Sequence, residues 1–143
     1  MSSLFQKFIT LSSLEKKLFI EAYFFSVYSR FVIKIFPFKW YEKSLGQKNK
    51  ILPATNYSNR EMLSYIKFAV RRVSRHSFWR NQCFEQSYAT MLMLKRRNIP
   101  YTLYFGLQHE DKTLKAHVWI ATGDFYFVNK GNINFTTVST YSN

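Results

Sequence analysis

Residues 101–107 are Tyr101, Thr102, Leu103, Tyr104, Phe105, Gly106 and Leu107, and at this point the hydrophobic pattern of the chain changes. Before it, apolar residues recur at steps of three and four, which is typical of helices packed on one side. Within it, Leu103, Phe105 and Leu107 alternate with Thr102 and Gly106, which is typical of a β-strand. The stretch therefore divides a helical first part from a second part made of strands.

The first of three predicted helices begins at a capping box, Ser12-Ser13-Leu14-Glu15, and must stop at Pro37. Residues 18–38 are the most apolar part of the chain, but Glu21, Arg30 and Lys34 interrupt them, which favours a buried or surface-lying helix over a membrane span. The predicted inner stripe is Leu14, Leu18, Ala22, Phe25 and Tyr28, and the residues expected to widen it are Phe31, Val32, Ile33, Ile35 and Phe36.

Two further helices follow a basic, loop-like stretch at residues 43–53 that contains Gly46. One begins at a second capping box, Ser58-Asn59-Arg60-Glu61, and fades near Arg75; the other spans about 81–97 and ends at Asn98 and Pro100. Their predicted inner residues are Met62, Ile66, Ala69, Val70 and Val73 in the first, and Cys83, Ser87, Met91 and Leu94 in the second.

Three more strands are expected after residue 107. A polar turn at 109–112 leads to a strand at 113–121, and Thr122-Gly123-Asp124 leads to another at 125–129; residues 133–138 form the last. Helices that precede an antiparallel meander make an α+β fold. The length of 143 residues predicts a single domain, 1–143.

Composition excludes several kinds of protein. A single Cys rules out an internal disulfide framework and multi-Cys metal sites, and favours a reducing, cytoplasmic setting. Only eight acidic residues are present, so carboxylate-clustered metal hydrolases and two-carboxylate glycosidases are disfavoured, and we expect neither a metal nor another cofactor. The formal charge of +13 favours contact with something anionic, which charge alone does not identify.

The lone Cys83 lies at the start of a predicted helix, where unpaired amides favour a thiolate and can donate to an oxyanion. A buried Cys that acts as a small apolar side chain is the alternative. A thiol nucleophile needs a base, and imidazole suits that task. His109 and His76 lie in predicted polar connections, whereas His117 stands inside a strand pattern, where a polar ring needs a reason; a core His with satisfied hydrogen bonds is the other interpretation.

Three segments carry a resemblance to a known family. They are residues 81–89 (NQCFEQSYA), 93–106 (MLKRRNIPYTLYFG) and 114–120 (LKAHVWI). A Cys followed 34 residues later by a strand His, with a Trp two places beyond, resembles the transglutaminase-like, papain-related cysteine proteases. More closely, the segments look like the lasso-peptide leader peptidases, the stand-alone peptidase halves of the maturation B protein. Phe36-Pro37-Phe38 and Trp79 are also similar to that family.

This resemblance implies a cytoplasmic bacterial cysteine peptidase with a helical N-terminal part, 1–57, and a catalytic core, 58–143. It would remove the leader from a ribosomally made lasso-peptide precursor, with Cys83 as nucleophile and His117 as general base and then acid. Its partners would be the precursor leader, a separate leader-binding protein (the RiPP recognition element), and an asparagine-synthetase-like lasso cyclase that uses ATP. Nucleic acid is not expected as a partner, because no nucleic-acid fold signature is present.

The resemblance also implies a third catalytic residue, an Asp or Asn opposite the His on the next strand. The sequence offers two candidates for it. If Gly123 and Asp124 are the tip of a two-residue hairpin, Thr122 faces Phe125 and His117 faces Lys130. Asn129 is then beside the facing position, and we prefer it as the group that orients His117. Asp124 is the competing candidate, and a longer or bulged hairpin would favour it.

Three more residues are candidates for the surroundings of the thiol. Gln82 precedes Cys83 and is a possible oxyanion donor, while Trp79 and Trp119 would wall the thiolate; a polar helix start and ordinary core packing are the alternatives. Two other functions stay open. The same Cys-His pair would serve an acyltransferase or transglutaminase, and a non-catalytic basic binding module would also explain the charge.

Overall fold

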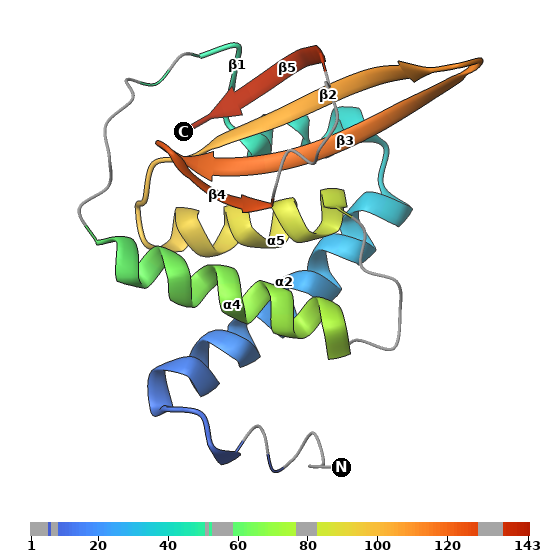
Figure 1. Cartoon of the computed structure of the whole chain (residues 1–143). Coiled ribbons are helices and arrows are strands. Elements are labelled where there is room, and N and C mark those ends of the chain that lie inside the picture. Colours follow the sequence, from blue (N-terminus) through green and yellow to red (C-terminus); the bar gives the residue numbers. More distant parts are fainter. Residues whose placement is uncertain (1–5, 7–8, 51, 53–58, 77–82, 129–135) are drawn as a thin grey trace.

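The computed structural model describes residues 6, 9–50, 52, 59–76, 83–128 and 136–143. Three long helices lie on one side of an antiparallel sheet (Figure 1). The α+β class is therefore confirmed. In chain order the elements are α2 (Ser13–Ile35), α3 (Phe38–Tyr41), the 3-10 helix η1 (Glu42–Leu45), β1 (Gln47–Lys48), α4 (Arg60–His76), α5 (Cys83–Arg96), β2 (Thr102–Glu110), β3 (Thr113–Thr122), β4 (Phe125–Val128) and β5 (Thr136–Ser142).

The first capping box is confirmed. Ser12 Oγ accepts from the Glu15 amide at 3.2 Å, and Glu15 Oε2 accepts from the Ser12 amide at 2.9 Å, so two end amides of α2 are satisfied. The helix ends at Ile35, just before Phe36 and Pro37. None of the helices in the described part of the chain combines the length and apolar character needed to cross a bilayer.

The buried side of α2 differs from the predicted stripe. Leu14 and Tyr28 are exposed, as are Phe31 and Ile35, which we expected to widen the inner face. The helix buries about one residue in each turn, and three of these are small. The buried residues are Leu18, Ala22, Ser26, Ser29 and Val32. Small residues allow close packing, and Ser29 satisfies its hydroxyl inside the helix by donating to the Phe25 carbonyl at 2.6 Å. The predicted side is therefore confirmed in part, because Leu18, Ala22 and Val32 are buried. Phe25, Ile33 and Phe36 also pack against the core.

Helices α4 and α5 follow the sequence closely, with one change at the start of α4. Asn59 Oδ1 accepts from the Met62 amide at 3.1 Å, so Asn59 caps α4, whereas Ser58 lies outside the described residues. Helix α5 ends as expected at Asn98, whose φ of 54° is left-handed. The Ile99 amide donates to the Leu94 carbonyl at 3.0 Å and the Asn98 amide to Lys95 at 3.1 Å, which is a Schellman end.

The sheet departs from the predicted meander. Within the described residues its strand order is β1-β5-β2-β3-β4, with every pairing antiparallel. Strand β5 lies between β1 and β2, so the chain crosses the sheet after β4. Its described part spans Thr136–Ser142, four residues past the predicted end at 138, and residues 133–135 lie outside the described residues. The β2–β3 turn is shorter than expected: His109 belongs to β2, and only Asp111 and Lys112 connect the strands.

The stretch 43–53 was predicted to be loop-like, and this was wrong for its first part, which belongs to η1 and β1. The regular structure of this region spans residues 38–48. They form α3, η1 and β1. Phe38 contacts Phe105 and Tyr141 of the sheet, while buried Tyr41 contacts Phe84 and Tyr88 of α5. The Leu45 carbonyl accepts from the buried hydroxyl of Tyr101 at 2.7 Å. This contact with a distant residue holds the segment in place, and it leaves no periodic pattern in the sequence. Gly46 links η1 to β1 with a φ of 122°.

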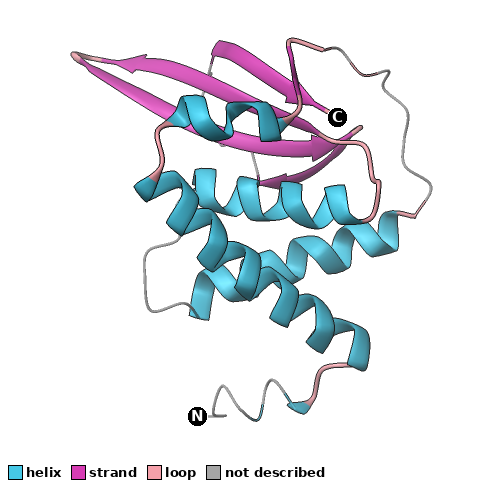
Figure 2. Ribbon diagram, turned by 180° about the vertical axis from the view of Figure 1, so that it is seen from behind, coloured by secondary structure: helices cyan, strands magenta, loops and turns pink. Residues whose placement is uncertain are grey.

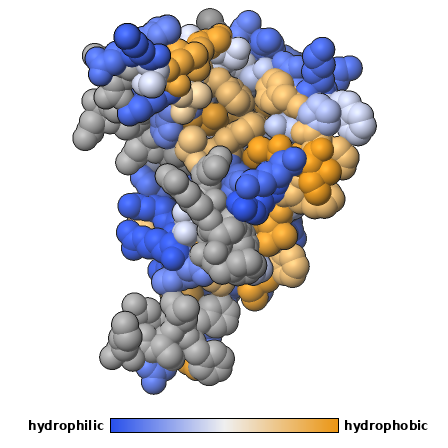
Figure 3. Space-filling model, turned by 90° about the vertical axis from the view of Figure 1, so that its right-hand side faces the viewer, coloured by the Kyte–Doolittle hydropathy of each residue, from blue (hydrophilic) through white to orange (hydrophobic). Residues whose placement is uncertain are grey.

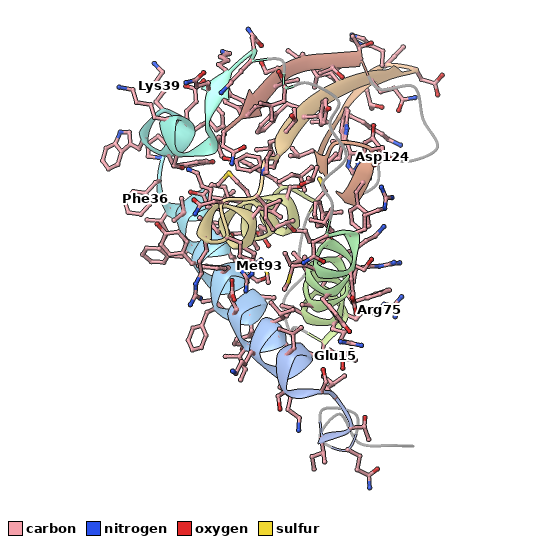
Figure 4. The ribbon with its side chains drawn as sticks, turned by 90° about the vertical axis from the view of Figure 1, so that its left-hand side faces the viewer. Glu15, Phe36, Lys39, Arg75, Met93 and Asp124 are labelled. Atoms are coloured by element: carbon pink, nitrogen blue, oxygen red, sulfur yellow. The ribbon has the colours of Figure 1, made fainter. Side chains whose placement is uncertain are left out.

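The core lies between the three long helices and the sheet. Leu18 of α2, Leu63 and Ile66 of α4, Met93 of α5 and Ile120 of β3 are all essentially inaccessible to solvent. Figure 4 shows Met93 inside the molecule, between α2 and the sheet. Helix α2 thus contributes to the same core as the residues that carry the resemblance.

Glu21→Gln should lower the free energy of unfolding by about 1–2 kcal/mol, because Glu21 joins α2 to the end of α5. Its two carboxylate oxygens accept from Nη1 and Nη2 of Arg97 at 2.6 and 2.7 Å, and this hydrogen bonding raises the pKa of Arg97. Urea unfolding of the full chain measures the change. Asp124→Asn is the matched control, since its ion pair with Arg60 is exposed and should be worth about 0.5 kcal/mol or less. Equal losses for both variants would contradict the expectation.

Candidate active site

Cys83 is the first residue of α5, as the sequence predicted for a nucleophile. Its side chain is half-buried and packs against the core. The next residue, Phe84, contacts Phe105 of β2, with ring centroids 5.3 Å apart. The thiol therefore sits where the N-terminal amides of a 14-residue helix meet the sheet, a location that favours negative charge.

His117 lies in the middle of β3, half-buried and opposite Gly106 of β2. Its ring stacks on that of Trp119, with centroids 5.8 Å apart and planes 22° from parallel. Trp119 is buried and in turn stacks on Tyr104, with centroids 5.4 Å apart and planes 5° from parallel. Trp119 thus covers one face of the His117 imidazole, and its expected role as a wall beside the thiolate stays a prediction.

Helix α5 and strand β3 meet beside both residues. The hydroxyl of Ser87, one turn after Cys83, donates to the carbonyl of Val118 at 3.4 Å. Among the described residues, β4 pairs with β3 at Ile120–Thr122. The fold thus brings the start of α5 to the part of β3 that carries His117 (Figure 1).

The structure brings the two elements together but shows no contact between the side chains of Cys83 and His117 in the part of the chain that it describes. Side chains alternate along a strand, so Val118 and Ile120 face the helical core, while His117 and Trp119 point to the other face with Tyr104. No hydrogen bond joins the Cys83 thiol to His117 among the described residues. By this alternation the His117 ring lies on the face of β3 opposite the helices, so its pairing with the Cys83 thiol stays a prediction.

The hairpin that decides between Asn129 and Asp124 has the predicted two-residue tip. Thr122 faces Phe125, but a bulge between Ile120 and Ala121 places Ile120 opposite Val128 instead of Phe127. The register counted from the tip therefore shifts by one residue beyond the bulge. Asn129 lies outside the described residues, as do Gln82 and Trp79.

The structure does not bring Asp124 to His117. Its carboxylate is exposed at the hairpin tip and accepts from Arg60 Nη1 at 2.8 Å. Thr122, the last residue of β3, is already five residues from His117, which corresponds to about 17 Å along an extended strand. Asp124 thus links the hairpin to α4, and the bulge does not favour it as the orienting group.

A cavity of about 280 Å³ adjoins His117. Its lining is mainly apolar and comes from β2, β3, β5 and the α3–η1 segment, including Phe38, Phe105, Leu107 and Ala116. At one wall, the Tyr141 hydroxyl donates to Glu42 Oε1 at 2.8 Å. Burial, and then the hydrogen bond to Glu42, raise the pKa of Tyr141 to about 12, so the phenol stays neutral and the wall carries one ion-paired carboxylate. Sequence reasoning missed Glu42 and Tyr141, which lie 99 residues apart in the chain.

Comparison with known proteins gives one positive result. A family model of the transglutaminase-like superfamily matches residues 32–140, about three quarters of the chain, including Cys83 and His117. The chain belongs to the transglutaminase-like superfamily. Searches of curated proteins and of solved structures return no significant match.

Members of the transglutaminase-like superfamily are usually catalytic, as cysteine proteases or as transglutaminases. Both activities use a thiolate at the start of a helix and an imidazole on a neighbouring strand, which is the placement described for Cys83 and His117. Of the other two histidines, His76 is exposed at the end of α4 and His109 is exposed in β2. Among the described residues, no group of His, Cys, Asp and Glu side chains is arranged to hold a metal ion.

Proposed function

We propose that this chain is a cysteine peptidase that removes the leader from a lasso-peptide precursor. The observation that carries the chemistry is the placement of Cys83 as the first residue of α5, against the part of β3 that bears His117, inside the region matched by the superfamily. The three resembling segments support the choice of substrate. They include the start of α5, its Schellman end with β2, and the His-x-Trp of β3.

In the proposed mechanism, His117 accepts the proton of the Cys83 thiol, and the thiolate attacks the scissile carbonyl of the leader–core bond. Amides at the start of α5, including that of Cys83, donate to the oxyanion. The C–N bond then breaks, and the imidazolium gives its proton to the leaving amine of the core peptide. Water, deprotonated by His117, attacks the thioester, releases the leader carboxylate and restores the thiol. Stacking on Trp119 limits the orientations of the His117 ring during both proton transfers.

The partners follow from the substrate. A separate leader-binding protein would deliver the precursor, and a lasso cyclase would consume the freed amine by joining it to an acidic side chain. Acidic leader residues would be attracted by the net charge of +13. These partners belong to the proposal and are tested with it.

The test mixes the purified chain, a candidate precursor and the leader-binding protein, and measures intact masses over time. We expect two products whose masses sum to that of the precursor plus one water. A product that gains the mass of an added amine at the cleavage position would instead identify an acyltransferase. An unchanged precursor, with the leader-binding protein shown to bind both other components, would contradict the proposal.

Asp124→Asn should leave kcat/KM for leader removal within about twofold of wild type, because Asp124 is paired with Arg60 and lies far from His117. Asn129→Ala should lower it on the order of 10- to 100-fold, less than loss of the nucleophile, because Trp119 still orients the imidazole. Initial rates at substrate concentrations below KM provide the measurement. An inactive Asp124→Asn with a fully active Asn129→Ala would show that the orienting residue was assigned wrongly.

A further inference from the structure

Helix α2 has a second apolar side that faces away from the molecule. Its buried side packs on the core, and on the outer side large apolar side chains recur at steps of three and four. We call these residues, together with Trp40 of α3, the outer stripe. They are Ile20, Phe24, Val27, Phe31, Ile35 and Trp40, of which Phe24 is 67% and Trp40 is 72% exposed.

The outer stripe is continuous. The ring of Phe36 bridges its two parts, with its centroid 5.9 Å from that of Phe31 and 5.7 Å from that of Trp40. In Figure 2, which is seen from behind, no described element lies in front of α2. Figure 3 shows large hydrophobic side chains gathered along this side of the molecule, and Figure 4 shows Phe36 and Lys39 directed outward on it. Contiguous exposed apolar surface of this kind marks an interaction site.

The charges around the outer stripe are positive. Lys17 and Lys34 lie on the exposed side of α2 near its two ends, and Lys39 is exposed beside Trp40. The acidic residues of the helix are ion-paired: Glu15 with Arg72, and Glu21, which lines a cavity with Ile20 and Phe24, with Arg96 and Arg97. An occupant of this surface must therefore present apolar material bordered by negative charge.

We propose that the outer stripe docks the protein on an anionic phospholipid surface, with α2 lying in the plane of the interface. A helix with exposed Phe, Ile and Trp and only Lys at its borders matches such a surface, because apolar side chains enter the acyl boundary while lysines reach the headgroups. A second copy of the chain is a poorer fit. Stripe against stripe would bring lysines of the two copies together without an acidic residue to pair with them.

The experiment is co-sedimentation of the full chain with phosphatidylcholine vesicles and with equimolar phosphatidylcholine–phosphatidylglycerol vesicles at physiological salt. Phe24→Gln/Phe31→Gln removes apolar contact without changing charge and should lower partitioning at least about tenfold. Phe68→Gln is the matched control, since Phe68 on α4 is 51% exposed, as is Phe31, and should bind like wild type. Lys17→Gln/Lys34→Gln should lower binding about 25-fold, or about fivefold for each Lys.

Circular dichroism establishes that each variant is folded, and the lysine variants keep a test available if the phenylalanine pair misfolds. Equal binding of wild type to neutral and anionic vesicles, or equal binding by the Phe24/Phe31 and Phe68 variants, would overturn the proposal. Analytical ultracentrifugation without lipid is the second arm. A stable dimer of the wild type that the Phe24/Phe31 variant abolishes would assign the outer stripe to self-association instead.

Discussion

Cys83→Ala should abolish leader removal, with kcat/KM lower by about 10⁴-fold or more, while the chain remains folded. The thiol is the only one in the sequence, so no second nucleophile of this type can take its place. The chain should remain folded because Cys83 is only half-buried, so alanine leaves at most a small cavity. Alanine is also compatible with the first position of α5. Intact-mass measurement of the precursor gives the rate, and circular dichroism gives the fold.

The histidines provide the matched control for this prediction. His117→Ala should be as damaging as Cys83→Ala, because no group would then accept the thiol proton or protonate the leaving amine. His109→Ala, in the exposed part of the neighbouring strand β2, should cleave at the wild-type rate. Cleavage by the Cys83→Ala protein at even a tenth of the wild-type rate would reject the proposed nucleophile.

Gly46→Ala should lower the free energy of unfolding by about 3 kcal/mol or more. At a φ of 122° an L-residue is strained, and a Cβ at Gly46 would lie 2.5 Å from the Ser142 carbonyl oxygen and 2.8 Å from its carbon. Both atoms are backbone of β5, which is paired to β1 and β2, so neither can move without breaking strand pairing. The displacement would also pull on Leu45, whose carbonyl holds the Tyr101 hydroxyl.

Gly123→Ala separates the two causes. Gly123 has a φ of 58° at the β3–β4 turn, so alanine there carries the conformational cost, about 1–2 kcal/mol. Urea denaturation of both variants at the same protein concentration compares them. A loss at Gly46 that is no larger than the loss at Gly123 would show that the clash with β5 is relieved by a small shift of the chain.

Local signals in the sequence were sufficient for much of this fold. The Ser12–Glu15 capping box, the Asn98 helix end and the Gly123–Asp124 hairpin tip are each determined by a few neighbouring residues, and the structure has all three. The same locality explains why Cys83 and His117 were found on a helix start and a strand. Their placement depends on periodicity and helix ends, which a sequence displays directly.

Other features depend on contacts between distant segments and left no local signal. Strand β1 exists because Gln47 and Lys48 pair with β5, about 95 residues later, and neither residue has strand propensity of note. The bulge between Ile120 and Ala121 shifts the register of β4, and neither residue is a Gly or Pro that would have predicted it. The buried side of α2 was predicted only in part, because Ser26 and Ser29 are buried without an apolar signal, while Tyr28 and Phe31 are left exposed.

The position of β5 constrains when this protein can fold during synthesis. Strands β1 and β2 do not pair with each other; each pairs with β5, whose residues leave the ribosome long after both. Helices α2, α4 and α5 and the β2–β3 hairpin can assemble earlier, because their contacts involve only residues already made. Until residue 142 emerges, both strands keep an unpaired edge exposed to other nascent chains. The nascent protein should therefore need protection from aggregation until β5 has emerged, and should acquire its full sheet only after synthesis of β5.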